Sequence, residues 1–334
     1  MVPVVEISVR SGAGAEGVAL REEVGSARSP GSGSAAGVTM RRGETRAIAL
    51  RAATWLTRRL PRPTRYWLAD MGGNAAHALL RPRAVVAAEN YLAFTRGDRR
   101  AAARLTRRAF VNYARTVMDF LVLDDLLAEV VNADPPPVTD PLRRALALGR
   151  GAIVVTPHFG NWDLGAAVTT VCGRRVSAVA DPFGPPAVDE LVRSMRERLG
   201  VRIIPTGPPS AREALRVLRR GEVLCLAADI DRSGAGTPVE FLGRVVFMPA
   251  GPATLALRTG APLIPGYVRR LPNSGHEAVL WDPISPPGPG ASPARVRAMT
   301  QEMAGAFEAM IRLDPSQWFA FHHLVAGRPG PREG

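Results

Sequence analysis

The pattern of apolar and polar positions divides the chain near residue 140. Beyond it, short apolar runs bounded by Gly, Pro or charged residues alternate with stretches of helical periodicity. Such alternation is typical of an α/β fold, in which a mainly parallel central sheet is flanked by helices. The predicted strands are residues 152–156, 176–180, 201–204, 223–228, 263–268 and 277–281. The predicted helices of this part are residues 162–171, 187–199, 210–220, 250–259 and 292–312.

Helical periodicity dominates the chain before residue 134. Ile48, Trp55 and Leu56 fall on one helical face, whereas Arg51 and Arg58 fall on another. Two interpretations of such faces stay open: packing against the rest of the protein, or contact with a membrane interface with Arg side chains toward lipid phosphates. The mixture of Trp, Tyr and Arg favours an N-terminal helical membrane-associating segment. The predicted helices here are residues 44–60, 66–80 and 100–127.

The two ends of the chain show neither the helical periodicity nor the apolar runs of the predicted strands. Residues 1–40 are rich in Gly, Ser and Ala, and we predict a disordered N-terminal extension. Residues 41–326 are predicted to form a single domain, mostly helical over 41–133 and α/β over 142–326, and 327–334 is a tail. No run of about 18 uncharged apolar residues occurs, and the first residues lack the features of a signal peptide. We therefore expect neither a transmembrane helix nor a leader.

Composition adds a strong positive charge to this picture. The 334 residues carry a formal net charge of +13, and every basic residue is Arg. This charge implies an anionic partner, such as a membrane surface, nucleic acid or an acidic substrate. Nucleic acid is disfavoured because no basic motif is interleaved with aromatic residues.

Cys172 and Cys225 lie in apolar stretches, as expected for reduced thiols. The adjacent His322 and His323 have no Cys or His cluster near them in sequence that would complete a metal site.

The segment that follows the first predicted strand carries the clearest chemistry. The strand at 152–156 runs into Pro157, so His158 lies at its carboxyl end, where α/β sheets place their sites. Asn161 is suited to cap the next helix. Asp163 then falls in the first turn of that helix, from where its carboxylate can meet the imidazole and support it as a general base. The spacing alone is weak, because many histidines simply cap or pack against a helix.

Three segments together resemble a known family. They are His158-Phe-Gly-Asn-Trp-Asp163, residues 226–244 with the run Val239-Glu-Phe-Leu-Gly243, and residues 248–265 beginning Met248-Pro-Ala-Gly. They are similar to the lysophospholipid acyltransferase-like superfamily, in particular the lipid A acyltransferase type and its phosphatidylinositol mannoside acyltransferase branch. The resemblance covers residues 44–325.

The resemblance implies roles for particular residues. The implied catalytic residues are His158 as general base, Asp163 as its partner and Glu240 as a further carboxylate near the histidine. The implied substrate-binding residues are Arg196, for which Arg198 is a competing assignment, and Asp181. The sequence itself adds Arg232, beside the Gly-rich turn that ends at Gly236, which could hold an anion through backbone N–H groups; a plain flexible loop is the alternative. Asn161 is a further candidate for substrate binding. The chain departs from the branch at Asp181-Pro182, where an Arg is lost, and at Leu242, where a second Phe is usual. Both departures weaken the assignment of the acceptor more than that of the reaction.

The resemblance also implies an activity. A fatty acyl chain would move directly from acyl-CoA, or from acyl carrier protein, to a hydroxyl of a glycolipid acceptor similar to phosphatidylinositol mannoside. The enzyme would need no cofactor or metal and would lie peripherally on the cytoplasmic face of the cell membrane. The alternatives are a lysophospholipid or lipid A-like acceptor, and a non-catalytic basic protein that binds membranes through its charge.

Overall fold

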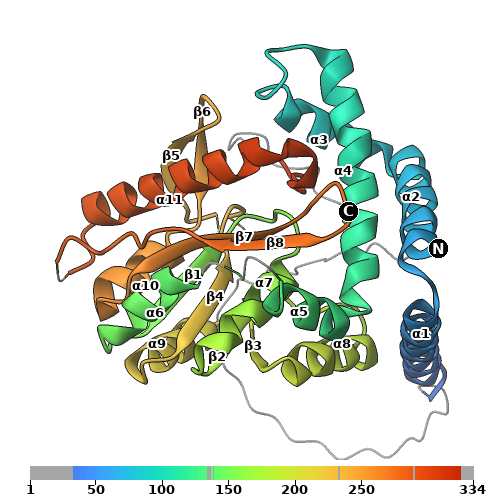
Figure 1. Ribbon diagram of the computed structural model, residues 1–334, viewed down its shortest axis with the longest axis horizontal. Helices are drawn as coiled ribbons and strands as arrows, with labels where there is room; N and C mark the ends of the chain where they lie inside the picture. The colour runs from blue at the N-terminus through green and yellow to red at the C-terminus, as the bar shows by residue number, and fades with distance from the viewer. Residues whose placement is uncertain (1–32, 134–136, 138, 232–233, 289, 325–334) are drawn as a thin grey trace, which may run out of the picture.

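The computed structural model describes residues 33–133, 137, 139–231, 234–288 and 290–324. Within these residues, one sheet has the strand order β3-β2-β4-β1-β7-β8 (Figure 1). All its neighbouring strands are parallel except β7 and β8, which are antiparallel. The prediction of a mainly parallel central sheet is therefore confirmed. Its strands are β1 Ala152–Thr156, β2 Val176–Ala180, β3 Val201–Pro205, β4 Val223–Ala227, β7 Leu263–Arg270 and β8 His276–Leu280.

Helices cover both faces of this sheet, and a separate apolar core lies on each face. In β1, Ile153 and Val155 join one core, whereas Ala152 and Val154 join the other. This division follows from the two-residue period of a strand, and it explains why the strands are apolar on both sides. One face carries α9 Ser210–Arg219, α10 Gly251–Thr259 and α11 Pro293–Leu313; the other carries α5 Leu123–Val131, α6 Asp140–Ala147 and α7 Trp162–Val168.

Several elements differ from the prediction. The helix predicted at 100–127 is two helices, α4 Arg99–Phe120 and α5, and the short helices α6 and α3 Arg81–Tyr91 were missed. A hairpin of β5 Thr237–Phe241 and β6 Arg244–Met248 was also missed, and it packs on α11. Its turn residues Leu242 and Gly243 both have positive φ, as a tight type I′ turn requires. These strands are as short as β1, but Thr237, Pro238 and Glu240 keep β5 from forming a continuous apolar run, so its sequence does not separate it from a loop.

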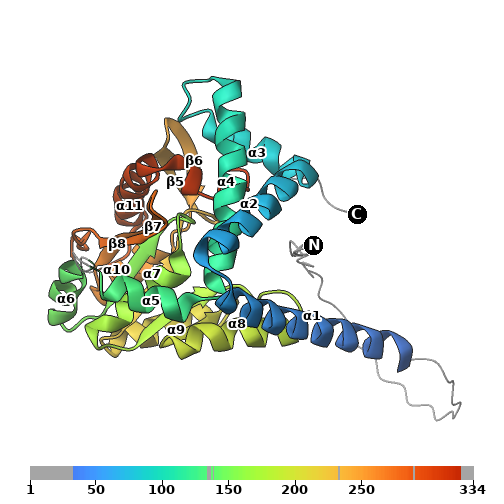
Figure 2. The ribbon, with the colours of Figure 1, turned by 45° about the vertical axis from the view of Figure 1, so that its right-hand side comes forward.

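Helix α1 Gly33–Arg59, which comes first among the described helices, is more exposed to solvent than the helices that cover the sheet. It begins before the predicted boundary, packs on α8 Pro186–Arg198 and extends past the body of the molecule (Figure 2). Its predicted apolar face is largely solvent-exposed: Ile48 is 64%, Trp55 57% and Leu56 51% exposed. In the described part of the chain, no helix is both long and apolar enough to cross a bilayer. Residues 1–32 and the predicted tail 327–334 lie outside the described residues.

A buried ionic cluster fastens α2 Arg62–Leu79 and α4 to the sheet edge. Asp119 of α4 accepts a hydrogen bond from the Tyr66 hydroxyl at 2.9 Å and one from the guanidinium of Arg270, and its Oδ2 lies 3.2 Å from His276 Nε2. All four side chains are buried. Burial alone would raise the pKa of Asp119, but the His276 hydrogen bond and the Arg270 charge outweigh it and hold the pKa below its usual value. Asp119 is therefore a buried counter-ion for Arg270.

Replacing this counter-ion is expected to destabilise the fold. Asp119→Asn leaves Arg270 buried without a neutralising charge, and the free energy of unfolding should fall by about 3–5 kcal/mol in urea titrations. Because the folded-state pKa of Asp119 is depressed, its stabilisation is present above the unfolded pKa of about 4 and is lost as the pH falls through the lower folded value. The variant should lack this acid-dependent component.

Asp282→Asn is the matched control for this prediction. Asp282 pairs with Arg144 at 2.9 Å, but both side chains are exposed, so its loss should cost less than about 1 kcal/mol. Equal effects of the two substitutions would contradict the assignment of Asp119 as a buried counter-ion.

Candidate active site

The loop between β1 and α7 carries His158 and is held in a conformation that requires glycine. Gly160 has a φ of +64°, and a Cβ atom there would lie 1.9 Å from the Val268 carbonyl oxygen. The Gly160 N–H donates to the Gln317 carbonyl at 2.9 Å, and the Asn161 N–H donates to the Val268 carbonyl at 2.8 Å. The loop is thereby fastened to β7 and to the C-terminal segment, residues 314–321.

The carboxylate that contacts the His158 ring belongs to Asp229. His158 Nδ1 and Asp229 Oδ1 are 2.6 Å apart. The contact follows from the pairing of β1 with β4, in which Thr156 lies opposite Ala227. His158 and Asp229 are each the second residue beyond this pair, so they meet at the same edge of the sheet.

The electrostatics of this pair define the tautomer of His158. Asp229 is buried, and burial acts to raise its pKa, but the charge of His158 and hydrogen bonds from His158 and Trp318 keep the pKa below its usual value. An ionised carboxylate only accepts hydrogen bonds, so Nδ1 of His158 must be the donor. Nε2 is then the basic nitrogen. The His158 side chain is 25% exposed, which gives it access to a substrate.

A second contact to Asp229 comes from the C-terminal segment. Trp318 Nε1 donates to Asp229 Oδ2 at 2.9 Å, and the Phe319 N–H donates to the His158 carbonyl at 2.8 Å. Trp318 is fully buried. Sequence reasoning missed both Asp229 and Trp318 as site residues. The signal for Asp229 was its place just after a predicted buried strand, whereas nothing local to Trp318 indicated its partner.

A series of aromatic side chains in edge-to-face contact leads from His158 to α4. The Trp162 ring lies 5.4 Å from the His158 ring, Phe319 lies 5.9 Å from Trp162, and Tyr113 of α4 lies 5.2 Å from Phe319, in each case measured between ring centres. Tyr113 is 38% exposed, yet desolvation raises its pKa, with a further contribution from Asp163 that Arg83 opposes. The Tyr113 ring is therefore partly exposed, with charged groups nearby.

Asp163 has a different partner from the one predicted. Asp163 lies in the first turn of α7, as predicted, but its Oδ1 accepts a hydrogen bond from Arg196 Nε at 2.8 Å. Asp229 thus takes the place expected for Asp163 beside the imidazole. The structure also separates the two candidate arginines of α8, because Arg196 is half-buried at this pair and Arg198 is exposed.

The remaining predicted site residues are distributed around the sheet. Asn161 caps α7, its Oδ1 accepting from the Leu164 N–H at 3.0 Å, which confirms the predicted cap. Asp181 accepts from the Thr206 hydroxyl at 2.6 Å, beyond the ends of β2 and β3. Arg232 lies outside the described residues.

The Glu240 side chain points toward solvent, away from the apolar core. Its neighbours Val239 and Phe241 are buried, so the two-residue period of β5 exposes the Glu240 side chain. Its backbone N–H and carbonyl are held by the Gln301 side chain at 2.8 and 2.9 Å. The predicted approach of Glu240 to His158 is absent from the contacts of the described residues.

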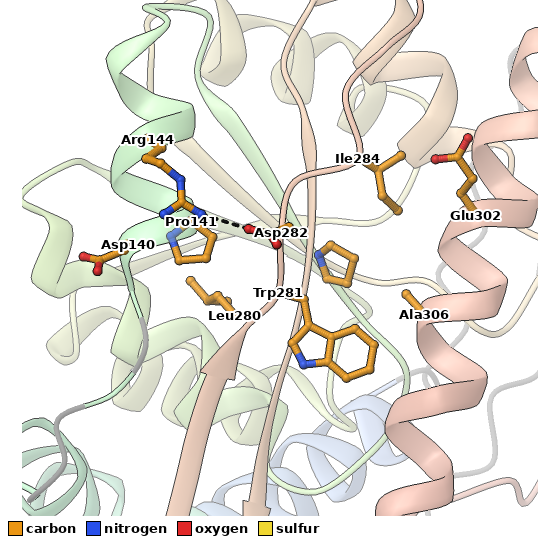
Figure 3. Close-up of a pocket in the computed structure, with 10 residues that line it drawn as sticks. Asp140, Pro141, Arg144, Leu280, Trp281, Asp282, Ile284, Glu302 and Ala306 are labelled. Atoms are coloured by element: carbon orange, nitrogen blue, oxygen red, sulfur yellow. Dashed lines mark hydrogen bonds and ion pairs between the residues drawn. The ribbon is translucent and has the colours of Figure 1, made fainter.

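A cleft of about 770 Å³ lies elsewhere, between α6, α11 and the end of β8 (Figure 3). Trp281 and Ile284 line it, together with the Arg144–Asp282 ion pair and Glu302 of α11. None of its lining residues comes from the His158 loop, the turn after β4 or the C-terminal segment. The cleft is therefore distinct from the His158 site.

Neither cysteine is suited to act as a nucleophile. Burial raises the pKa of the Cys225 thiol to about 12, and desolvation also raises the pKa of Cys172. A reactive cysteine needs a lowered pKa. The chemistry of the site therefore centres on the imidazole of His158.

A buried carboxylate and an accessible histidine at adjacent strand ends of an α/β sheet form an arrangement that is chemically capable of general-base catalysis. Residues 43–325 match the family model described as bacterial lipid A biosynthesis acyltransferase. The chain belongs to this family of acyl-transferring enzymes.

Curated relatives include proteins from two mycobacterial species. The phosphatidylinositol mannoside acyltransferase of Mycolicibacterium smegmatis is 35% identical over 183 residues, which are 54% of this chain and 58% of the relative. The protein of the same name from Mycobacterium tuberculosis H37Rv is 33% identical over 183 residues, 54% of this chain and 56% of the relative. The similarity thus spans little more than half the length of these relatives.

The geometry of the His158 loop predicts a sharp response to Gly160→Ala. The left-handed backbone alone costs roughly 1–2 kcal/mol for a residue with a Cβ atom, and the contact with the Val268 carbonyl adds to this cost. We expect lower thermal stability and an altered near-ultraviolet circular dichroism spectrum. Gly72→Ala is the control: Gly72 is an open position in α2, and the change should raise stability by about 0.5–1 kcal/mol. A neutral Gly160→Ala would contradict the described loop.

Proposed function

We propose that this protein transfers a fatty acyl chain from acyl-CoA to a hydroxyl of a glycolipid acceptor of the phosphatidylinositol mannoside type, with His158 as general base. The observation that carries the proposal is the 2.6 Å contact between His158 Nδ1 and the buried Asp229 carboxylate. The names of the mycobacterial relatives support the acceptor. A lipid A-like acceptor is the second candidate, because the matching family model is one of lipid A biosynthesis.

The proposed reaction uses Nε2 of His158. Nε2 removes the proton from the acceptor hydroxyl as its oxygen attacks the thioester carbonyl of the donor. The tetrahedral intermediate then releases the thiolate, which takes the proton from the imidazolium. Asp229 stabilises the imidazolium between these steps and keeps Nδ1 protonated. Direct attack on the thioester agrees with the raised pKa values of both cysteines.

We place the acceptor on the side of His158 where α4, α7 and α8 meet. Trp162 and Tyr113 offer aromatic surface there, and the half-buried Asp163–Arg196 pair supplies polar groups. Such a mixture of aromatic surface and a few fixed polar groups is typical of ligand sites. Arg196 is thus proposed as an acceptor-binding residue. Roles for Asp181, Asn161, Glu240 and Arg232 in binding or catalysis stay predictions.

We further propose that α1 and α2 bind the anionic surface of a membrane from its cytoplasmic side. Ile48, Trp55 and Leu56 of α1 and Trp67 and Met71 of α2 are more than half exposed. Exposed apolar residues on amphipathic helices bind the interface of a bilayer, and neighbouring Arg residues favour anionic lipids. The net charge of +13 also favours binding to an anionic membrane surface. The same charge would attract the anionic donor, whether acyl-CoA or acyl carrier protein.

The function is tested by acyl transfer from radiolabelled acyl-CoA to mannosylated phosphatidylinositol, with lysophospholipid and a lipid A precursor as competing acceptors. His158→Ala should lower kcat by about 10²–10⁴-fold because the base is lost. Turnover by His158→Ala near the wild-type rate would overturn the proposal, and membrane binding without transfer to any acceptor would favour the non-catalytic alternative.

Asp229→Asn and Asp163→Asn form a matched pair that separates the two carboxylates. Asp229→Asn should lower kcat about 100-fold or more, because the amide no longer stabilises the imidazolium. Asp163→Asn leaves the His158 contact in place and should act mainly on KM for the acceptor through Arg196. A larger loss of kcat in Asp163→Asn than in Asp229→Asn would favour Asp163 as the catalytic partner of His158.

Membrane binding is tested by vesicle sedimentation of two exposed leucine variants. Leu56→Ser of α1 removes an apolar contact with lipid and should weaken binding to phosphatidylglycerol-containing vesicles about 10-fold. Leu148, 62% exposed beyond α6, is the matched control, and Leu148→Ser should bind as the wild type does. Equal binding by both variants would argue against α1 as the membrane contact.

A further inference from the structure

The C-terminal segment contacts the His158–Asp229 pair although it lies far from both residues in the sequence. Trp318 and Asp229 are separated by 89 positions, and the indole Nε1 donates to Oδ2, the carboxylate oxygen that does not face Nδ1 of the His158 ring. Each oxygen of Asp229 therefore has its own aromatic N–H donor. The carboxylate is buried, so these donors compensate its charge in place of water.

The position of the indole is fixed by α3, by the turn that follows it and by α4. The Tyr91 hydroxyl of α3 donates to the Trp318 carbonyl, and Tyr91 and Phe94 pack edge-on against the Trp318 ring, with centres 6.1 and 6.0 Å away. Asn112 of α4 donates to the Ser316 carbonyl at 3.0 Å. An indole without freedom to rotate holds its N–H in one direction, and that direction is toward Asp229.

We propose that Trp318 is a positioning residue of the acyltransferase, which acts through Asp229 on the tautomer and basicity of His158. The Nε1–H bond fixes the carboxylate plane so that Oδ1 faces Nδ1 of His158, and Nε2 stays aimed at the acceptor hydroxyl. It also draws negative charge toward Oδ2, so the imidazolium formed during proton transfer is stabilised less than it would be by a carboxylate without this donor. This inference rests on the proposed function of His158.

The test replaces only the indole N–H. Incorporation of 3-benzothienylalanine at position 318 substitutes sulfur for the N–H and keeps the size of the ring, and Trp318→Phe is the genetically encoded counterpart. We expect kcat to fall about 10- to 100-fold with KM for acyl-CoA unchanged. The midpoint of the acidic limb of the kcat/KM profile should move to higher pH, because Asp229 then stabilises the imidazolium more strongly. A variant that only loosens the fold would lose active enzyme without moving this midpoint.

Two further measurements separate the possible outcomes. In an Asp229→Asn background, the position 318 replacement should cause little additional loss of kcat, since its effect passes through Asp229. The indole N–H resonance of Trp318 in ¹H–¹⁵N spectra should shift in Asp229→Asn, a readout that does not require activity. Trp281→Phe, in the separate cleft, is the matched control and should keep the wild-type pH profile.

The results that overturn the inference differ from those that overturn the function. A folded benzothienylalanine protein with the wild-type rate and pH profile would remove Trp318 from the site while leaving His158 as the base. A fully active His158→Ala would remove the proposed function itself. If the Trp318 resonance is unaffected by Asp229→Asn, the hydrogen bond does not exist in solution and the inference fails.

Discussion

The parallel register of β1 and β4 is the constraint on which the candidate site depends. Thr156 lies opposite Ala227, and both strands end at this level, so the residues that follow them share one edge of the sheet. His158 and Asp229 are in contact because of this register. Moving β4 by one residue would turn each of its side chains to the opposite face and disrupt the packing of both apolar cores. The apolar packing of the sheet thus determines the geometry of a polar pair.

Two buried carboxylates connect distant parts of the chain through hydrogen-bond donors. Asp229 joins the β1 loop to the C-terminal segment through His158 and Trp318, and Asp119 joins α2 and α4 to the β7–β8 edge through Tyr66, Arg270 and His276. Both carboxyl groups keep pKa values below their usual range despite burial, because the surrounding donors and positive charges outweigh desolvation. Loss of one partner leaves a buried charge uncompensated, which is why these clusters couple the stability of the fold to the geometry of the site.

Helix α4 links the exposed N-terminal helices to the chemistry. It packs along α2 and contributes Asp119 to the buried cluster. It also carries Tyr113, which contacts Phe319 in the series of aromatic rings next to His158. The helices proposed to bind a bilayer therefore neighbour the helix that contributes Tyr113 to the proposed acceptor site, as Figures 1 and 2 show for α1, α2 and α4.

The sequence by itself determined the class of fold, the strands of the main sheet, the Asn161 cap and the place of His158 at a strand end. These features depend on apolar periodicity and on chain neighbours, which are visible locally. It did not determine the partner of His158, because Asp163 lies close in the chain whereas Asp229 is 71 positions away and Trp318 is farther still. Only strand order, register and the docking of the C-terminal segment decide which side chains meet, and these depend on packing over the whole sheet. Packing also leaves the apolar face of α1 exposed, an outcome that helical periodicity cannot distinguish from burial.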